Sequence, residues 1–105
     1  FHHLPDYWKG VALKRMFRML KPGGRLYLRD VVMEEENLAD NIGALIDRQK
    51  KLGGDFLRQD ALEHFRDEYS TYDWVLDGML ERAGFVIHSK NTEGGLLTTY
   101  LAARP

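Results

Sequence analysis

Residues 19–28, which read MLKPGGRLYL, carry the strongest structural signal in the chain. Proline cannot continue a helix and glycine tolerates the left-handed angles of a sharp turn, so Lys21–Gly24 ends a helix. The residues over 25–32 are then almost continuously apolar or β-favouring. Such a run is typical of a strand that is buried on both faces, as in a parallel sheet. The stretch therefore predicts a helix, a tight turn and a buried strand, in that order.

Before this turn, the sequence predicts a helix over residues 7–20. Its apolar residues recur at helical spacing and make one stripe: Leu13, Met16, Phe17 and Leu20. Pro5 and Asp6 are start signals, because a carboxylate at a helix start can accept hydrogen bonds from the free amides of the first turn.

After the strand, an acidic loop at 33–37 leads into further helical patterns. Apolar spacing predicts helices at 38–52, which Gly53 and Gly54 end, at 56–68, and at 72–83, which Gly84 ends. Ser70 and Asp73 have the spacing of a capping box at the start of the last helix.

Two β-rich runs, 85–89 and 96–102, close the chain around a glycine-containing turn at 91–95, which predicts an antiparallel hairpin. A right-handed crossover through the helices makes the first two strands parallel, so the last strand runs backwards. We therefore predict an α/β fold with a mixed sheet of about three strands, the last one antiparallel, and three to four helices.

Composition excludes several classes of protein. The chain has 105 residues, with 15 basic and 16 acidic side chains and a formal net charge of −1, so it lacks the basic surplus of a nucleic-acid binder. It has no cysteine, which excludes disulfides and thiolate metal sites. No apolar run is long enough to span a bilayer and no signal peptide is visible, so we expect no membrane partner and a cytoplasmic location.

The order of elements, with its reversed last strand, resembles the C-terminal half of the class I, Rossmann-like S-adenosylmethionine-dependent methyltransferases. The local sequence agrees with this resemblance at four places. Residues 2–6 resemble the segment that leaves the family's fourth strand, 19–28 the turn into the fifth, 80–85 the start of the sixth, and 97–103 the reversed seventh.

The resemblance implies that residues 1–105 are the C-terminal half of a single methyltransferase domain. The family holds S-adenosylmethionine mainly through a glycine-rich loop after its first strand and an acidic residue that ends its second. Neither feature is present here, so we expect the chain alone to bind no cofactor well and to be inactive. The parent enzyme would methylate a small-molecule substrate, and this part would supply the cleft floor and the substrate-side loops.

By the same resemblance, His2 and His3 would line the cleft near the transferred methyl group. A histidine there could contact the cofactor or the substrate, or act as a base. The alternative is a structural pair that flanks a strand end. No paired catalytic group is identifiable, so no catalytic residue is assigned. Adjacent histidines diverge and no third ligand is evident, so no metal site is predicted.

Three further residues are candidates for the substrate side. Asp30 lies near the carboxyl end of its strand, where it could face the cleft, cap the loop or pair with Arg29. Tyr69 and Tyr72 cluster in sequence with Trp74 and Phe65. These aromatic residues could form a substrate wall or pack a short helix against its neighbour.

A second hypothesis is a non-enzymatic interaction or dimerisation module that retains only this half of the fold. The strand at 25–32 would then lack the neighbour that the fourth strand provides in the family. An unpaired apolar strand invites pairing with another chain, so a homodimer through that edge is expected. A third interpretation, a generic α/β domain, would be favoured if the last two strands did not form a hairpin.

Overall fold

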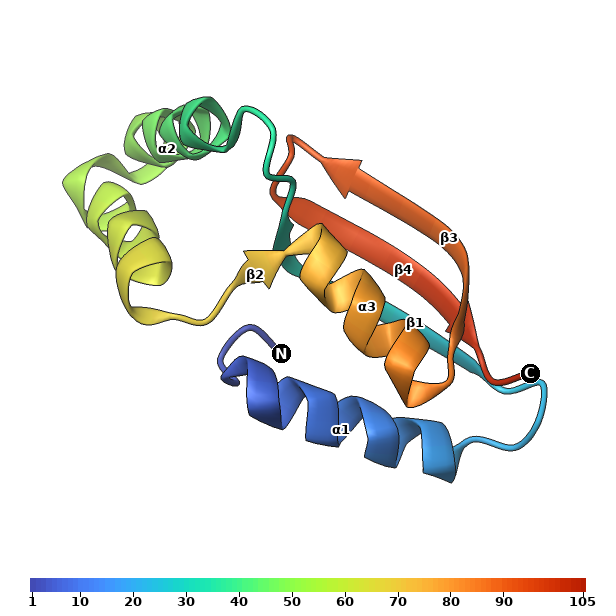
Figure 1. Ribbon diagram of the computed structural model, residues 1–105. Coiled ribbons are helices and arrows are strands. Elements are labelled where there is room, and N and C mark those ends of the chain that lie inside the picture. Colours follow the sequence, from blue (N-terminus) through green and yellow to red (C-terminus); the bar gives the residue numbers. More distant parts are fainter.

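The computed structural model describes residues 1–105 and has an α/β fold. Three helices and four strands follow one another along the chain (Figure 1). In order they are α1 (Asp6–Met19), β1 (Arg25–Met33), α2 (Leu38–Asp67), β2 (Thr71–Tyr72), α3 (Asp73–Ala83), β3 (Val86–Glu93) and β4 (Leu97–Ala103). No helix combines the length and the apolar character needed to cross a bilayer.

The strands form one mixed sheet in the order β2-β1-β4-β3. The last strand, β4, lies between β1 and β3 and is antiparallel to both, so the predicted hairpin and the reversed last strand are confirmed. The sheet has four strands rather than three, because Thr71 and Tyr72 pair in parallel with Val32 and Met33. A two-residue strand leaves no periodic pattern for sequence analysis to detect.

The turn after α1 forms as predicted, with Gly23 at a φ of +85°. The end of α1 is also tied to the end of the chain, since the Arg104 guanidinium donates to the carbonyl oxygens of Phe17 at 2.9 Å and Leu20 at 2.7 Å. The last carbonyls of a helix lack the usual donor four residues further on, and the carbonyl oxygen of Phe17 otherwise accepts from the amide of Leu20 at 3.2 Å. The side chain of Arg104 thus fixes α1 beside the sheet.

The predicted break at Gly53 and Gly54 is present as a kink inside α2, where Gly54 has a φ of +66° and a ψ of −150°. The predicted capping box was wrong. The N-cap of α3 is Tyr72, with no side-chain cap, because the residues before α3 are extended and pair with β1. The hydroxyl of Ser70 instead lies 2.8 Å from Nε2 of His64.

The hairpin turn is tighter than predicted. β3 continues to Glu93, and Gly94 and Gly95 make the turn with φ angles of +58° and +72°. Two successive residues with positive φ match the twist of antiparallel strands, which is why the pair of glycines sits at the tip.

The core lies between the sheet and the two helices α1 and α3, which run side by side (Figure 1). Its buried residues are Leu13, Val32, Leu76, Leu80, Phe85, Tyr100 and Ala102. Helices cover only one face of the sheet over most of its length, so β1 alternates between covered and exposed residues and Tyr27 is 67% exposed. The prediction that this strand is buried on both faces was therefore wrong.

Candidate functional site

A cluster of polar side chains lies at the carboxyl end of β1. Asp30 comes from β1, His2 from the segment before α1, His64 and Glu68 from the end of α2, and Ser70 from the residues before β2. Ligands bind beyond the carboxyl ends of strands in open α/β sheets, so this is the place where a functional site is expected.

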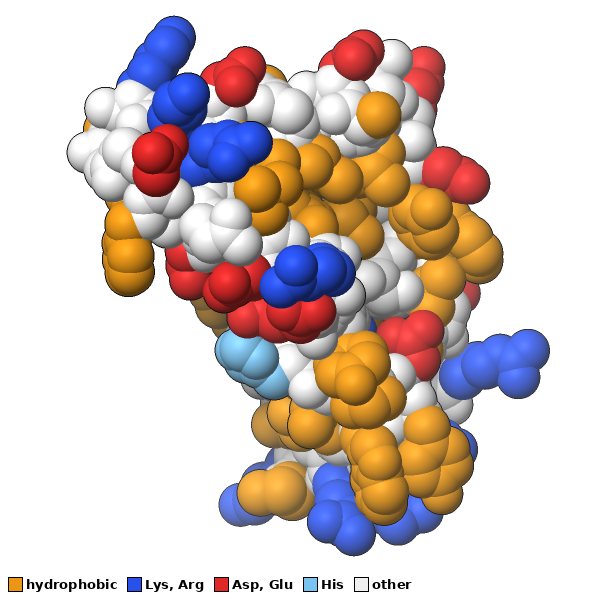
Figure 2. Space-filling view, turned by 90° about the vertical axis from the view of Figure 1, so that its left-hand side faces the viewer, with side chains coloured by type: hydrophobic (Ala, Val, Ile, Leu, Met, Phe, Trp, Pro, Cys, Tyr) orange, Lys and Arg blue, Asp and Glu red, His pale blue; other side chains and the backbone are white.

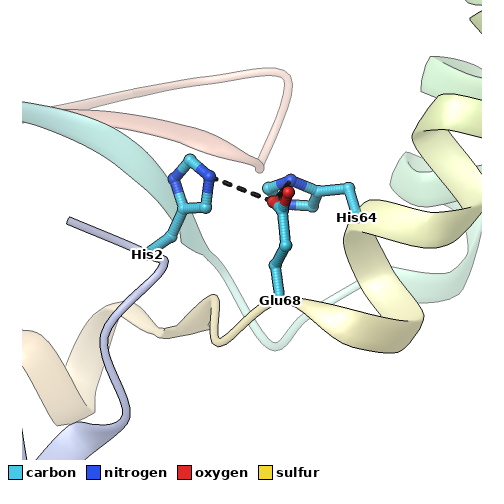
Figure 3. A group of neighbouring side chains, drawn as sticks. All are labelled: His2, His64 and Glu68. Atoms are coloured by element: carbon cyan, nitrogen blue, oxygen red, sulfur yellow. Dashed lines mark ion pairs between the residues drawn. The ribbon is translucent and has the colours of Figure 1, made fainter.

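The Glu68 carboxylate lies between two imidazole rings (Figure 3). Its Oε2 is 3.0 Å from Nε2 of His2 and also contacts Nδ1 of His64. His64 and Glu68 are four residues apart at the end of α2, so both side chains project from the same side of the helix. His2, in contrast, is far from Glu68 in the sequence and reaches it only through the tertiary fold.

The outward nitrogen of each ring has its own partner. Nδ1 of His2 lies 2.6 Å from Oδ1 of the buried Asp30, and Nε2 of His64 lies 2.8 Å from Oγ of Ser70. Oδ1 of Asp30 also accepts a hydrogen bond from the backbone amide of Val31 at 2.8 Å. Each imidazole is thus oriented by an outer group, and its inner nitrogen faces Glu68.

The electrostatics at His64 favour the neutral ring. Burial lowers the pKa of His64 below its usual range, and the neighbouring His2 lowers it further, whereas Glu68 acts in the opposite direction. The pKa remains lowered because burial is the largest of these effects.

A buried lysine holds the segments of this cluster together. Lys9 is only 2% exposed, and its ammonium group donates a hydrogen bond to the carbonyl oxygen of Tyr69. The backbone amide of Tyr69 in turn donates to the carbonyl oxygen of His2 at 2.8 Å. Helix α1 therefore links the residue that follows Glu68 to the segment that carries His2.

The structure brings together two of the candidates from the sequence, His2 and Asp30. Asp30 pairs with His2 rather than with Arg29, whose guanidinium lies 3.4 Å from Glu93. His3 lies at the exposed margin, with its Nδ1 3.9 Å from Oε1 of Glu68.

The aromatic candidates are dispersed around the cluster. Tyr72 stacks on Trp74 with ring centroids 5.7 Å apart, and Phe65 lies edge-on to His64 at 4.8 Å. The side chain of Tyr69 is half exposed, and its backbone serves the contacts with Lys9 and His2.

Sequence analysis missed His64, Glu68 and Ser70. The local signal was a histidine and a glutamate four residues apart at a helix end, which places them on one face. Nothing local indicated that this face meets His2, because that contact depends on the return of α2 to the sheet.

A pocket of about 400 Å³ adjoins the cluster between α2 and the ends of the strands. Its apolar walls include Leu45 and Leu57 from α2 and Val31 and Leu97 from the sheet, and His64 forms part of its polar wall. Figure 2 shows hydrophobic side chains in an upper and a lower group on one face, with acidic and basic side chains and a histidine between them. The cluster thus lies beside a largely apolar space.

The chain does not fit a complete S-adenosylmethionine site. Its glycine pairs lie in the turn after α1, in the kink of α2 and at the hairpin tip, and none of them connects a strand to a following helix as a nucleotide-binding loop does. The residues that follow β1 are instead Glu34, Glu35 and Glu36, all exposed. No step of chemistry is therefore assigned to that cofactor here.

No protein-family model matches this sequence, and no curated protein shows significant similarity to it.

Proposed function

We propose that this chain forms the substrate-side part of an S-adenosylmethionine-dependent methyltransferase that acts on a small-molecule acceptor. The observation that supports the proposal most directly is the reversed strand β4, which lies beside β1 and closes a hairpin with β3. A reversed last strand after a helix–turn–strand unit is what the resemblance to this family implies. A generic α/β domain would be favoured if the last two strands did not form a hairpin.

The pocket supports an acceptor of modest size. Its volume of about 400 Å³ lies within the range of about 300–1,000 Å³ that is usual for small-molecule sites. Apolar walls would hold the body of the acceptor, and His64 would face a polar group. Methyl transfer depends largely on holding donor and acceptor in line, so the chain's contribution is the position of the acceptor.

The incomplete covering of the sheet supports a role as one part of a larger unit. Tyr27 is 67% exposed on the face opposite α1 and α3, and residues 25–31 of β1 have no partner on the side away from β4. Sheets of α/β proteins are covered on both faces, so a further segment that covers this face and grips the cofactor fits these observations.

Calorimetric titration with S-adenosylhomocysteine tests the proposal. We expect that the 105 residues alone do not bind S-adenosylhomocysteine with micromolar affinity. If a strand and a glycine-rich loop precede residue 1 in the parent gene, we expect the product of that gene to bind the cofactor and to transfer a methyl group. Micromolar binding to the 105 residues would contradict the expectation that another segment holds the cofactor. A parent product that neither binds the cofactor nor transfers a methyl group would contradict the proposed activity.

The free edge of β1 favours the second hypothesis, a homodimerisation module, as an alternative. Residues 25–31 offer unpaired backbone groups, and an unpaired edge can accept a strand from a second copy. Light scattering at high micromolar concentration tests this idea. A dimer whose β1 amides are protected from hydrogen exchange would support it, and a clean monomer would refute it.

A further inference from the structure

We propose that His2, His64 and Glu68 form a binding site for a divalent transition-metal ion of the zinc type. This site lies outside the features on which the methyltransferase proposal is based. Metal binding at this site does not depend on methyl transfer, so an experiment can contradict one of the two proposals and leave the other standing.

The donor atoms are close enough to share one ion. One ligand atom from each of the three residues lies within 4.8 Å of the other two, and Nε2 of His2 is 3.0 Å from Oε2 of Glu68. Tetrahedral zinc ligands at about 2.1 Å from the metal lie about 3.4 Å from one another. Small side-chain shifts would therefore convert the present arrangement into a coordination shell.

The outer contacts are those that metal-binding histidines have. Such a histidine commonly donates its second ring N–H to a carboxylate or another oxygen, which fixes the tautomer and the ring orientation. Here Asp30 holds the outer nitrogen of His2 at 2.6 Å, and Ser70 holds that of His64 at 2.8 Å. Both inner nitrogens are thereby directed at the same carboxylate.

The Glu68 carboxylate supplies a further indication. Its Oε2 is buried beside the two imidazole nitrogens, yet neither contact has the geometry of a good hydrogen bond. A buried anionic oxygen without a hydrogen bond is costly, and a bound cation would remove that cost. A carboxylate simply bridging two imidazoles is the competing explanation, and it predicts no uptake of metal.

The donor set indicates which class of ion would bind. Imidazole nitrogen suits zinc, copper, iron and nickel, whereas magnesium and calcium prefer oxygen ligands only. Two histidines and one glutamate are also a ligand set that leaves a fourth position open in zinc sites. Because His64 lines the pocket, a bound ion would lie at its edge, where it could polarise a coordinated hydroxyl group.

Titration of untagged, chelator-stripped protein with zinc sulfate tests the site. We expect one ion per chain with micromolar or tighter affinity, and a weakening of at least about 100-fold in H64Q and in E68Q. The matched control is H88Q, because His88 is exposed in β3, far along the chain from the cluster, and should bind zinc as the wild type does. The absence of binding to the wild type, or equal weakening in H88Q, would overturn the proposal.

Two further measurements test the site even if H64Q or E68Q fails to fold. Cobalt(II) added to the wild type should give the visible absorption of a tetrahedral site, and zinc should bleach it. The substitution Asp30→Asn keeps an acceptor oxygen but removes the negative charge beside Nδ1 of His2, so it should weaken zinc binding by about 10- to 100-fold. A wild type without a tetrahedral cobalt spectrum, or D30N with unchanged affinity, would contradict the proposed shell.

Discussion

Gly84 ends α3 with a φ of +112°, and a Cβ built on it would lie 2.7 Å from the ring of Phe17. We expect Gly84→Ala to lower the free energy of unfolding by about 2–4 kcal/mol, because it adds left-handed strain to an overpacked contact between α3 and α1. Urea unfolding measures this change.

The matched control lies in the same helix. Gly78 is inside α3, and a Cβ there would meet nothing within 4 Å. Gly78→Ala should therefore raise the free energy of unfolding by about 0.5–1 kcal/mol, since alanine has the better helix propensity. Equal effects of the two substitutions would show that the contact with Phe17 does not limit this position.

Lys9 is the second residue with a testable role. Lys9→Met keeps the unbranched apolar part of the buried side chain but leaves the carbonyl of Tyr69 without its donor, so we expect a loss of about 1–3 kcal/mol in the free energy of unfolding. The exposed Lys14 of the same helix provides the control, and Lys14→Met should change stability by less than about 0.5 kcal/mol. If chemical unfolding gives the same free energy of unfolding for both variants, the contact of Lys9 with Tyr69 does not stabilise the fold.

These two residues differ in how far the sequence could predict them. Gly84 follows an apolar helical stripe and was recognised as a helix end from its neighbours alone. Lys9 is a charged residue on a helix, which normally indicates exposure. Its burial arises from a partner 60 positions away, and no local pattern contains that information.

At the scale of elements, Tyr100 connects β4 to α3. Its hydroxyl donates to the Asp77 carboxylate at 2.6 Å, and Lys90 of β3 pairs with Asp77 and with Asp73 at 2.8 and 2.7 Å. Burial, together with the hydrogen bond to Asp77, raises the pKa of Tyr100 far above its ordinary value. The carboxylates also raise the pKa of Lys90, although its partial burial opposes this.

This arrangement predicts a loss of stability at alkaline pH. The folded chain keeps the Tyr100 proton that the unfolded chain releases, so stability is complete below about pH 10 and falls above it, by about 1.4 kcal/mol per pH unit. In a phenolate absorbance titration, Tyr100 should ionise only when the chain unfolds. Tyr100→Phe should flatten the alkaline decline, and an unchanged decline would assign it to other groups.

Most elements could be predicted because their signals are local. The turn at Gly23, the kink at Gly54 and the hairpin at Gly94 all follow from the backbone preferences of glycine. The strand β2 could not be predicted, because its two residues are extended only through pairing with β1. The same pairing displaced the expected capping box at Ser70.

At the scale of the whole molecule, the candidate site is the part that sequence could predict least. His2 and Asp30 were recognised singly, from their expected places near strand ends. Their meeting with His64 and Glu68 requires α2 to fold back toward the carboxyl end of β1, which is a property of the tertiary structure. The molecule is elongated, with extents of 47 × 23 × 21 Å, and α2 makes few contacts with the other helices and strands.

Weak packing of α2 gives the last prediction. Only Ala61 is buried among its 30 residues, whereas the 11 residues of α3 include the buried Leu76 and Leu80. Most of the stability of a helix in a protein comes from the packing of its apolar face, and local opening is easiest where few apolar contacts hold an element. We therefore expect hydrogen exchange over residues 38–53 to be about 10-fold or more faster than over α3. Equal protection of the two helices would contradict the prediction and would show that contacts other than those within this single chain stabilise α2.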